Sequence, residues 1–166
     1  MMKTELKIAK TNEKAILPRK RYEDAGLDIF PCLDKPFVTI PAGATVAIPT
    51  GIAIACTPDF CIVAKERSSL GKMGLALRAG VCDSGYRGEY KILLTNTTSH
   101  AFVIDEAVKE VVISEKTGTV TLPAIKAIAQ LLVLPVPELT INLMDYDRFK
   151  ELPSERGTSW NGSTDK

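Results

Sequence analysis

The sequence has 166 residues, of which 45% are hydrophobic and 25% charged, a balance typical of one globular domain with a substantial core. The formal net charge is +1 at pH 7, so no strong overall field favours nucleic acid or a membrane surface. No apolar run approaches the roughly 20 residues of a membrane-spanning helix, and residues 1–10 lack the hydrophobic core of a secretion signal. We therefore expect an intracellular, cytoplasmic protein that binds neither nucleic acid nor membrane.

Short segments rich in Val, Ile and Thr follow one another along the chain, each bounded by Pro, Gly or Asp. This pattern predicts β-strands, and their regular spacing indicates an all-β sandwich, jelly roll or small barrel. Helix is confined to two short candidates, at residues 105–110 and 145–152. The predicted strands, in chain order, cover residues 5–10, 37–41, 44–57, 60–66, 89–96, 101–104, 109–114, 118–123, 127–136 and 139–143.

The composition changes after Pro153. The remaining residues are rich in Ser, Gly, Thr and Asn, and Trp160 is their one large apolar side chain. Such a segment has little to bury, so we predict a β domain over residues 1–152 and a flexible C-terminal tail over residues 153–166.

The cysteines lie in apolar, strand-like segments and form no CxxC pair. We interpret them as reduced thiols packed in the interior of an intracellular protein, with disulfides or a metal site as the alternative. The residues concerned are Cys32, Cys56, Cys61 and Cys82.

Residues 80–90, GVCDSGYRGEY, combine a tight-turn pair with a carboxylate and an aromatic ring. An Asp followed by Ser-Gly is common in turns, so Asp83 as a turn cap is the simplest interpretation. Two other segments change that balance. RSSLG, beginning at Arg67, and RGTSWNGST, beginning at Arg156, each combine an arginine with hydroxyl groups and glycine, which can bind phosphate oxygens. The tail that carries the second segment resembles a lid that closes on an anion.

Five segments, in order, resemble the five motifs of the homotrimeric deoxyuridine triphosphatases (dUTPases), and together they span nearly the whole chain. The segments are AGLDIF (25–30), RSSLG (67–71), AGVCDSGYRGEY (79–90), AIAQLLVLPV (127–136) and RGTSWNGST (156–164). The resemblance implies a distorted β jelly roll with a mobile tail. It implies hydrolysis of dUTP to dUMP and pyrophosphate, which limits uracil incorporation into DNA and supplies dUMP. It also implies a homotrimer with shared active sites, and Mg²⁺ held by substrate phosphates and water without direct protein ligands.

The same resemblance implies roles for the residues of the hairpin. Asp83 resembles the general base that orients and deprotonates the attacking water. Tyr86 resembles the ring that packs under the deoxyribose, where a 2′-hydroxyl would have no room. The backbone of Gly80, Val81 and Cys82 is expected to read the uracil edge and to reject cytosine, whose polar groups would stay unpaired.

Further contacts are implied for residues outside the hairpin. Asp28 is expected near Arg67 or near the waters of the metal ion, with a solvated strand-end position as the alternative. Arg87 and Glu89 are expected to pair structurally, without a catalytic role. The residues expected to contact the phosphates or to close over the substrate are Arg67, Ser68, Ser69, Gln130, Arg156, Gly157, Trp160, Asn161, Gly162 and Ser163.

The chain departs from the family pattern at four places. In the last motif an aromatic ring usually precedes the glycine of Gly-Ser-Thr directly, but here Asn161 holds that place and Trp160 lies one residue earlier. Ala127 stands where the fourth motif usually has an arginine, and Ala79 lies where some relatives carry an asparagine. Residues 105–123 form a longer segment than usual, interpreted as an added hairpin or a helix plus strand. It is either an elaborated loop or a surface for a protein partner.

Two alternatives come from other functional classes. A dCTP deaminase has a related fold and also carries Arg-Ser-Ser-Leu-Gly, but it needs a glutamate in the strand after the hairpin, where residues 91–96 (KILLTN) contain no acid. A regulatory protein on the same fold would hold a partner with residues 105–123 and could lose its catalytic groups. Asp83, Tyr86 and Gln130 are nevertheless all present.

Overall fold

The computed structural model describes residues 4–155 and 157–158. Their regular secondary structure is almost entirely β-strand, with two short helices, which confirms the all-β, jelly-roll-type fold predicted from the sequence. In chain order the elements are β1 (Lys7–Lys10), β2 (Leu27–Ile29), β3 (Phe37–Ile40), β4 (Thr45–Pro49), β5 (Ile52–Ala55), β6 (Phe60–Lys65), α1 (Ser68–Gly71), β7 (Leu75–Arg78), β8 (Val81–Cys82), β9 (Lys91–Asn96), β10 (Phe102–Asp105), β11 (Val112–Ile113), β12 (Val120–Pro123), β13 (Ala129–Pro135) and α2 (Tyr146–Lys150).

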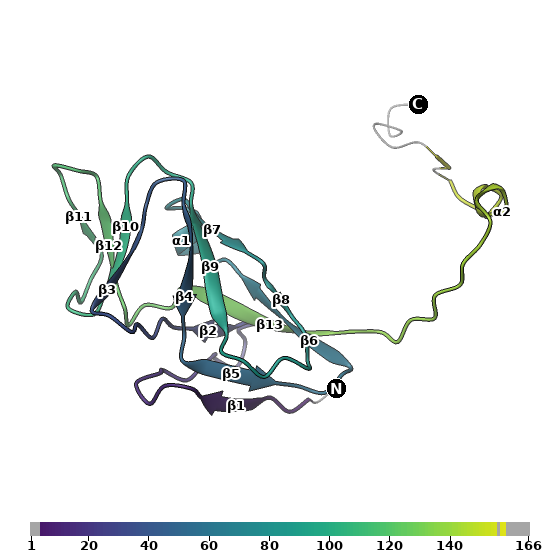
Figure 1. Cartoon of the computed structure of the whole chain (residues 1–166), viewed down its shortest axis with the longest axis horizontal. Coiled ribbons are helices and arrows are strands. Elements are labelled where there is room, and N and C mark those ends of the chain that lie inside the picture. Colours follow the sequence, from purple (N-terminus) through teal and green to yellow (C-terminus); the bar gives the residue numbers. More distant parts are fainter. Residues whose placement is uncertain (1–3, 156, 159–166) are drawn as a thin grey trace. The chain divides into compact units, whose positions relative to one another are not determined.

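The described strands pair across long distances in the sequence, as Figure 1 shows. They form four sheets, with the orders β1–β5, β11–β12–β10–β3, β2–β13–β6–β8 and β4–β9–β7. β10 and β12 pair in parallel, and the other ladders are antiparallel. Such crossovers between sheets distinguish a jelly roll from a simple meander.

The core follows from the two-residue period of a strand, which sends alternate side chains to opposite faces. β10 buries Phe102 and Ile104 and leaves Val103 partly exposed, and β12 buries Val120 and Leu122 in the same way. One hydrophobic cluster collects these side chains from all the sheets. Its largest fully buried members are Phe102, Ile29, Ile40, Ile48, Ile52, Ile62, Leu70, Leu75, Ile92, Leu94, Ile104 and Leu122.

Two predicted elements are wrong. Residues 105–110 form no helix, because Asp105 ends β10 and its carboxylate accepts a hydrogen bond from the Ala107 N–H at 2.8 Å, which begins a turn instead. Residues 139–143 form no strand, and their apolar side chains stay exposed because no neighbouring strand of the chain pairs with them. In both cases the local pattern was right for the predicted element, and tertiary context decided otherwise.

The sequence also missed four short elements and one break. β2, α1, β7 and β8 have only two to four residues each, which is too short for a clear periodicity. The long strand predicted over residues 44–57 is divided into β4 and β5 at Gly51, whose φ of 64° lies in the left-handed region. A glycine adopts that conformation without the steric cost that other residues incur.

The segment 105–123 contains a hairpin, β11–β12, and no helix. β12 belongs to the core sheet because it pairs with both β10 and β11 and buries Leu122. β11 lies at the edge of this sheet, and its Val112 and Ile113 are exposed. Only the first half of the segment is therefore a surface addition.

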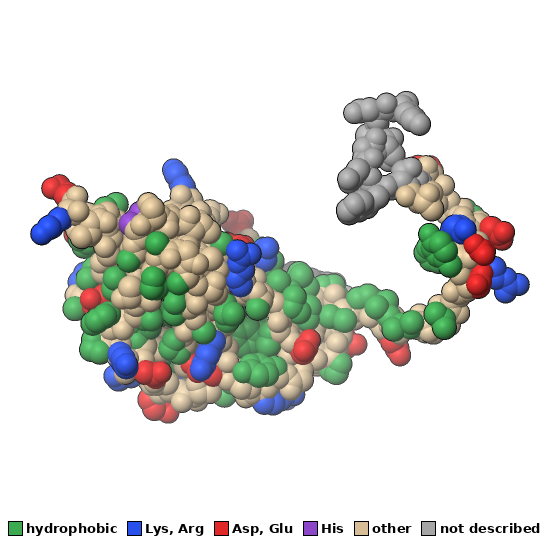
Figure 2. All heavy atoms as spheres, turned by 45° about the horizontal axis from the view of Figure 1, so that its top comes forward, with side chains coloured by type: hydrophobic (Ala, Val, Ile, Leu, Met, Phe, Trp, Pro, Cys, Tyr) green, Lys and Arg blue, Asp and Glu red, His purple; other side chains and the backbone are tan. Residues whose placement is uncertain are grey.

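The chain divides into two compact units, the first ending at Val136 and the second beginning at Pro137. The division follows the end of β13 at Pro135 and precedes the boundary of 152/153 predicted from composition. Figure 2 shows hydrophobic side chains exposed along the stretch that follows β13. Across the part of the chain that the structure describes, no helix has the length and apolar content needed to cross a membrane.

Candidate functional site

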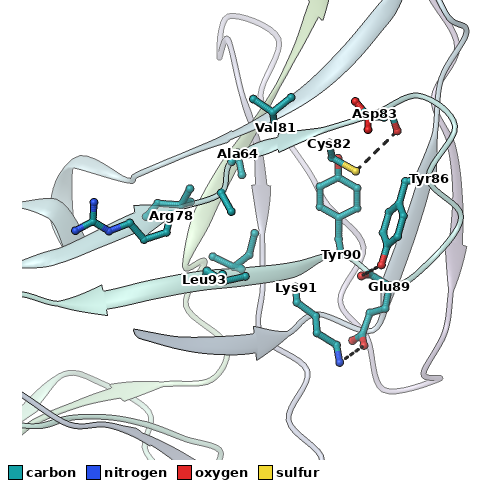
Figure 3. Close-up of a pocket in the computed structure, with 14 residues that line it drawn as sticks. Ala64, Arg78, Val81, Cys82, Asp83, Tyr86, Glu89, Tyr90, Lys91 and Leu93 are labelled. Carbon is teal, nitrogen blue, oxygen red and sulfur yellow. Dashed lines mark hydrogen bonds and ion pairs between the residues drawn. The ribbon is translucent and has the colours of Figure 1, made fainter. Parts of the chain in front are cut away.

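A pocket of about 330 Å³ lies beside the bend between β7 and β8 and the turn that follows β8. We call it the hairpin pocket, and its walls come from β6, β7, β8, β9 and the loop between β8 and β9. It brings together all the hairpin residues that the resemblance implicates, which are Gly80, Val81, Cys82, Asp83 and Tyr86 (Figure 3). Their roles stay predictions, but they share one cavity.

The backbone enters this pocket through a sharp bend before β8. Ala79 has a φ of 49°, a left-handed conformation that a residue with a Cβ seldom adopts. Gly80 follows at the closest approach to β6, where the Ala64 N–H donates to the Gly80 carbonyl at 2.7 Å. A Cβ at Gly80 would overlap the Ala64 carbonyl oxygen. The bend therefore needs a glycine at this position. After the bend, the backbone of Val81 and Cys82 runs along the pocket.

Asp83 lies at the start of a tight turn. The Tyr86 N–H donates to the Asp83 carbonyl at 3.1 Å, which closes the turn around Ser84 and Gly85. Arg87 braces the same turn, because its guanidinium donates to the carbonyls of Ser84 at 2.6 Å and Tyr86 at 2.9 Å. The backbone is thus held without the Asp83 carboxylate, which lies exposed on the pocket wall and is available for chemistry.

The predicted pair between Arg87 and Glu89 is wrong, because each has other partners. The Glu89 carboxylate accepts hydrogen bonds from the backbone N–H groups of Thr50 at 3.1 Å and Gly51 at 2.8 Å, and it lies 3.8 Å from the Lys91 ammonium. Glu89 therefore ties the end of the hairpin to the turn between β4 and β5. This role is structural, as the sequence indicated.

Tyr86 is 47% exposed, so part of its side chain is accessible, while other contacts hold the ring in place. Its hydroxyl donates to the Glu89 carbonyl at 3.2 Å. Gly88 lies so close that a Cβ there would overlap the Tyr86 hydroxyl. The edge of the ring also meets Tyr90, with centroids 6.4 Å apart and an angle of 67° between the planes. The exposed part of the side chain can therefore pack against a flat or puckered ring of a ligand.

The cysteines are free thiols within the described residues. Cys32 is buried, and Cys56, Cys61 and Cys82 are partly buried. Burial raises the pKa of the Cys82 thiol, which lines the hairpin pocket, and of Cys56 and Cys32. These thiols are therefore protonated near neutral pH, which agrees with the interpretation as packing residues rather than nucleophiles.

A second pocket, of about 630 Å³, is rich in cationic and hydroxyl side chains, and we call it the basic pocket. Strand register positions the side chains of this pocket. Gln130 of β13 lies opposite Asp28 of β2 and opposite Lys65 of β6. Residues directly opposite each other in antiparallel strands project to the same face. Arg67, which follows β6, therefore reaches the same cavity as Gln130 and Asp28, and Ser68 and Ser69 line it as well.

Contacts in the basic pocket orient its donor groups. Arg67 Nε lies 3.2 Å from Asp28 Oδ1, and Arg67 Nη1 donates to the Ala127 carbonyl at 3.3 Å. Gln130 Nε2 donates to the Glu66 carbonyl at 2.8 Å. The guanidinium of Arg67 and the carboxylate of Asp28 are each about one-third exposed, so both groups can also reach a ligand. The proximity of Asp28 to Arg67 expected from the resemblance is present.

The sequence interpretation missed other cationic residues of this pocket. Arg19, Lys20 and Arg21 line it together with Asp24. Arg21 forms an ion pair with Asp24 at 3.1 Å, and the hydrogen bond from Arg21 holds the pKa of that carboxyl below its ordinary value. The Arg19 guanidinium lies 5.0 Å from the centre of the Phe30 ring. The signal was the run of three basic residues that ends at Arg21, separated from the first motif by three residues.

The residues of the last motif divide between described and undescribed parts of the chain. Gly157 belongs to the second unit, has a φ of 56° and donates its N–H to Ser154 Oγ at 3.0 Å. The other predicted residues of this motif lie outside the described residues, and they are Arg156, Trp160, Asn161, Gly162 and Ser163.

Within residues 4–155 and 157–158, no group of three or more His, Cys, Asp or Glu side chains is arranged to hold a metal ion. The carboxylates of the basic pocket, Asp24 and Asp28, lie among cationic side chains. The all-β fold thus carries one pocket walled by hairpin backbone and a carboxylate, and a second pocket whose arginine and hydroxyl groups are the donors that suit a phosphorylated small molecule.

Comparisons with known proteins identify the family. The family model of dUTPase matches residues 12–109. Deoxyuridine 5'-triphosphate nucleotidohydrolases of Paraburkholderia phymatum and Clostridium acetobutylicum are each 34% identical to this chain. The first match covers 99% of both chains, and the second covers 96% of this chain and 95% of its relative. The chain therefore belongs to the dUTPase family.

Solved structures support the fold. EIAV dUTPase superimposes with a TM-score of 0.62 at 26% identity, over 85% of this chain and 97% of that chain. The dUTPase of Staphylococcus bacteriophage 80alpha, solved with dUPNHPP, has a TM-score of 0.71 at 24% identity, over 96% of this chain and 98% of that chain. The second likeness concerns the fold alone, since its identity is low.

Proposed function

We infer that this chain hydrolyses dUTP to dUMP and pyrophosphate. Membership of the dUTPase family and the name of its bacterial relatives support this activity. The single observation that carries the mechanism is that Asp83, Tyr86 and the backbone of Gly80, Val81 and Cys82 line one pocket. Base recognition, sugar recognition and a candidate base for water activation thus come from one short hairpin.

The hairpin pocket would bind the nucleoside. Backbone N–H and C=O groups around Val81 and Cys82 can match the donor and acceptors of uracil, while cytosine would leave polar groups unpaired. The accessible part of Tyr86 would pack under the deoxyribose and leave no space for a 2′-hydroxyl. Asp83 would orient a water toward the α-phosphorus and accept its proton. Since other groups hold the turn, the carboxylate is free for that task.

The basic pocket would bind the phosphates. Arg67 can present two N–H groups to phosphate oxygens, and its ion pair with Asp28 fixes the orientation of the fork. Ser68 and Ser69 add exposed hydroxyl donors. Gln130 has its amide nitrogen bonded to Glu66, so it would act through its oxygen or through water.

Mg²⁺ fits this pocket as an ion carried by the substrate. The Asp28 carboxylate lies among the proposed phosphate donors and is partly exposed, so it can accept hydrogen bonds from waters around the ion. When bound, the ion would neutralise negative charge on the triphosphate. The binding and orienting steps assigned to Arg67, Ser68 and Ser69 do not depend on a direct protein ligand to the metal.

We propose that a complete site needs more than one chain, because Asp83 and Arg67 lie toward opposite ends of β6. Cys82 lies opposite Ile62 in the antiparallel β6–β8 pair, and the chain leaves β8 toward Asp83 in the direction away from Lys65. The extended chain from Ile62 to Arg67 spans roughly 16 Å. A general base must lie within about 3 Å of its water, so this separation favours a site in which Asp83 and Arg67 come from different chains. We propose that the hairpin of one subunit completes the basic pocket of another.

Exposed apolar side chains in the second unit support an oligomer. Leu139, Ile141 and Leu143 alternate along the chain and are each at least 77% exposed. Contiguous apolar surface of this kind is unusual in a monomer and indicates a partner. We propose a homotrimer with shared sites, in which the last motif closes over the phosphates. Light scattering should give three chains per particle, and an active monomer would refute the shared site.

The activity is tested by hydrolysis of dUTP, dCTP, dTTP and UTP by the purified chain in the presence of Mg²⁺, followed through pyrophosphate release. We expect dUTP to be preferred by a wide margin, and we expect EDTA to stop the reaction. Release of ammonia from dCTP would indicate a deaminase instead. Binding of dUTP without pyrophosphate release would favour a regulatory protein on the same fold.

A further inference from the structure

Tyr90 is a pocket residue to which the motifs assign no role. It follows the hairpin directly, lines the hairpin pocket together with Asp83 and Tyr86, and is only 5% exposed. Its N–H donates to the Ile52 carbonyl at 2.7 Å, which fixes its backbone against β5. Tyr90 is therefore a rigid element inside a pocket whose other aromatic ring is half exposed.

The Tyr90 ring supports the Tyr86 ring from the side. The two centroids are 6.4 Å apart with planes inclined at 67°, which is the edge-to-face arrangement that aromatic pairs favour. The remaining contacts of Tyr86 hold its hydroxyl end, through the Glu89 carbonyl and the close approach of Gly88. These contacts fix the tip of the ring, while Tyr90 contacts the ring itself. The plane of Tyr86 is thus set jointly by its tip and by Tyr90.

The hydroxyl end of the Tyr90 ring faces the base-reading strand. The ring reaches from its backbone toward Cys82 (Figure 3). The hydroxyl is buried and has no hydrogen-bond partner of normal geometry among the described residues. Burial, with the neighbouring Cys82 thiol, raises the pKa of Tyr90 far above its ordinary value, so the hydroxyl stays protonated.

We propose that Tyr90 is a positioning residue that sets the plane of the Tyr86 ring relative to the base-reading backbone, and thereby sets how strongly the site rejects a ribonucleotide. The proposal rests on the proposed function, since it assumes that Tyr86 packs under the sugar. A shift of the Tyr86 plane would open room beside the 2′ carbon. It would also reduce contact with the deoxyribose. Discrimination against the ribonucleotide would therefore fall, because UTP would bind better and dUTP would bind worse.

The experiment measures kcat/KM for dUTP and for UTP in wild type, Tyr90→Leu and Tyr90→Phe. Loss of the ring in Tyr90→Leu should raise the UTP:dUTP ratio by about threefold to tenfold, the range that corresponds to one aromatic edge contact. The change should appear mainly in KM. Tyr90→Phe keeps the edge contact, so its ratio should stay within about twofold of wild type. In a double-mutant cycle, Tyr86→Leu should abolish the effect of Tyr90→Leu on the ratio.

Phe102→Leu is the matched control, because Phe102 is a fully buried core ring that is absent from the hairpin pocket. It should lower the melting temperature and leave the ratio unchanged. An unchanged ratio in folded Tyr90→Leu would overturn the proposal, as would a shift of equal size in Phe102→Leu. If Tyr90→Leu does not fold, Tyr90→Met takes its place with the same expectation. Failure of wild type to hydrolyse dUTP would instead refute the proposed function.

Discussion

The hairpin pocket and the basic pocket are built by different means. The hairpin pocket depends on backbone shape, with a left-handed Ala79, a glycine against β6 at Gly80 and a braced turn after Asp83. The basic pocket depends on strand register and charge, with Gln130, Asp28 and Arg67 brought together across β13, β2 and β6. Selectivity should therefore reside mainly in the first pocket, and affinity for the phosphates mainly in the second.

Asp83→Asn should produce the largest effect on turnover. The amide keeps the size of the side chain but cannot accept the proton, and general-base catalysis typically contributes about 10²–10⁴-fold. We expect kcat to fall by about that factor, while the dissociation constant of a non-hydrolysable dUTP analogue changes little. The melting temperature should also stay near wild type, because the turn is held by backbone bonds and Arg87.

The matched control for this variant is Asp34→Asn, an exposed aspartate outside both pockets. Normal turnover in Asp83→Asn would show that Asp83 has no role in proton transfer and serves only to form the turn. Lost turnover accompanied by unfolding would show that the carboxylate served the turn rather than proton transfer.

Arg67→Gln should act on binding more than on selectivity. Hydrogen bonds to charged groups contribute about 1.5–3 kcal/mol, so the analogue should bind roughly 10- to 100-fold more weakly. Arg67→Lys keeps the charge but not the forked donor geometry, so its affinity for the analogue should lie between those of wild type and Arg67→Gln. Titration calorimetry at low and high salt measures the effect, and Lys116→Gln serves as a control on an exposed turn.

Ionic strength should affect binding in the basic pocket more than base selection in the hairpin pocket. Wild-type affinity should weaken as ionic strength rises, and the Arg67→Gln variant should lose part of this dependence. Preference for dUTP over dCTP should stay constant in both proteins. A large change in base preference on replacing Arg67 would contradict the division of roles.

Gly88→Ala should give a smaller effect confined to the hairpin pocket. The added methyl would overlap the Tyr86 hydroxyl, so the ring must tilt away from its position. We expect kcat/KM for dUTP to fall by about tenfold, an effect similar to the loss of one stacking contact. Gly71→Ala is a control for the general cost of replacing a glycine, since its added Cβ would meet no atom and its φ lies outside the left-handed region. Equal losses of kcat/KM in the two variants would show that ring position is unimportant.

Ala79→Gly should have the smallest effect, and it acts on stability. Glycine relieves the left-handed conformation at a φ of 49°, which costs other residues roughly 1–2 kcal/mol. It also adds about 0.4–1 kcal/mol of unfolded-state entropy. The net expectation is a gain of about 0.5 kcal/mol in the free energy of unfolding, measured by denaturant titration. Destabilisation by this variant would mean that the bend is not strained.

The sequence predicted the local half of this site well and the distant half less completely. Gly80, Asp83 and Tyr86 lie within seven residues, so one turn brings them together and the motif could be read directly. Arg19 reaches the basic pocket only because residue 19 bridges to Asp28 beside β13, and no local pattern contains that register.

The failed predictions have the same origin. Residues 139–143 were expected to form a strand, but no strand of the described chain pairs with them. The helix expected at residues 105–110 was overruled by the pairing of Asp105 with Phe37 and Pro123. Long-range pairing, which a single sequence does not display, decided each of these positions.

The most direct test is to restore activity by mixing two impaired variants, with activity measured as kcat/KM at dUTP concentrations far below KM, where the weaker binding of Arg67→Gln limits the rate. Asp83→Asn and Arg67→Gln chains are co-expressed with different affinity tags, and particles that carry both tags are purified. If the hairpin of one subunit completes the basic pocket of the next, every mixed trimer contains one fully wild-type site.

Random assembly should then recover roughly a quarter of wild-type activity in the unfractionated mixture and about a third in the doubly tagged particles. If both pockets of one chain served the same substrate, every site in every particle would carry one of the two lesions. Activity no higher than that of the separate variants, measured on doubly tagged particles, would contradict the shared site.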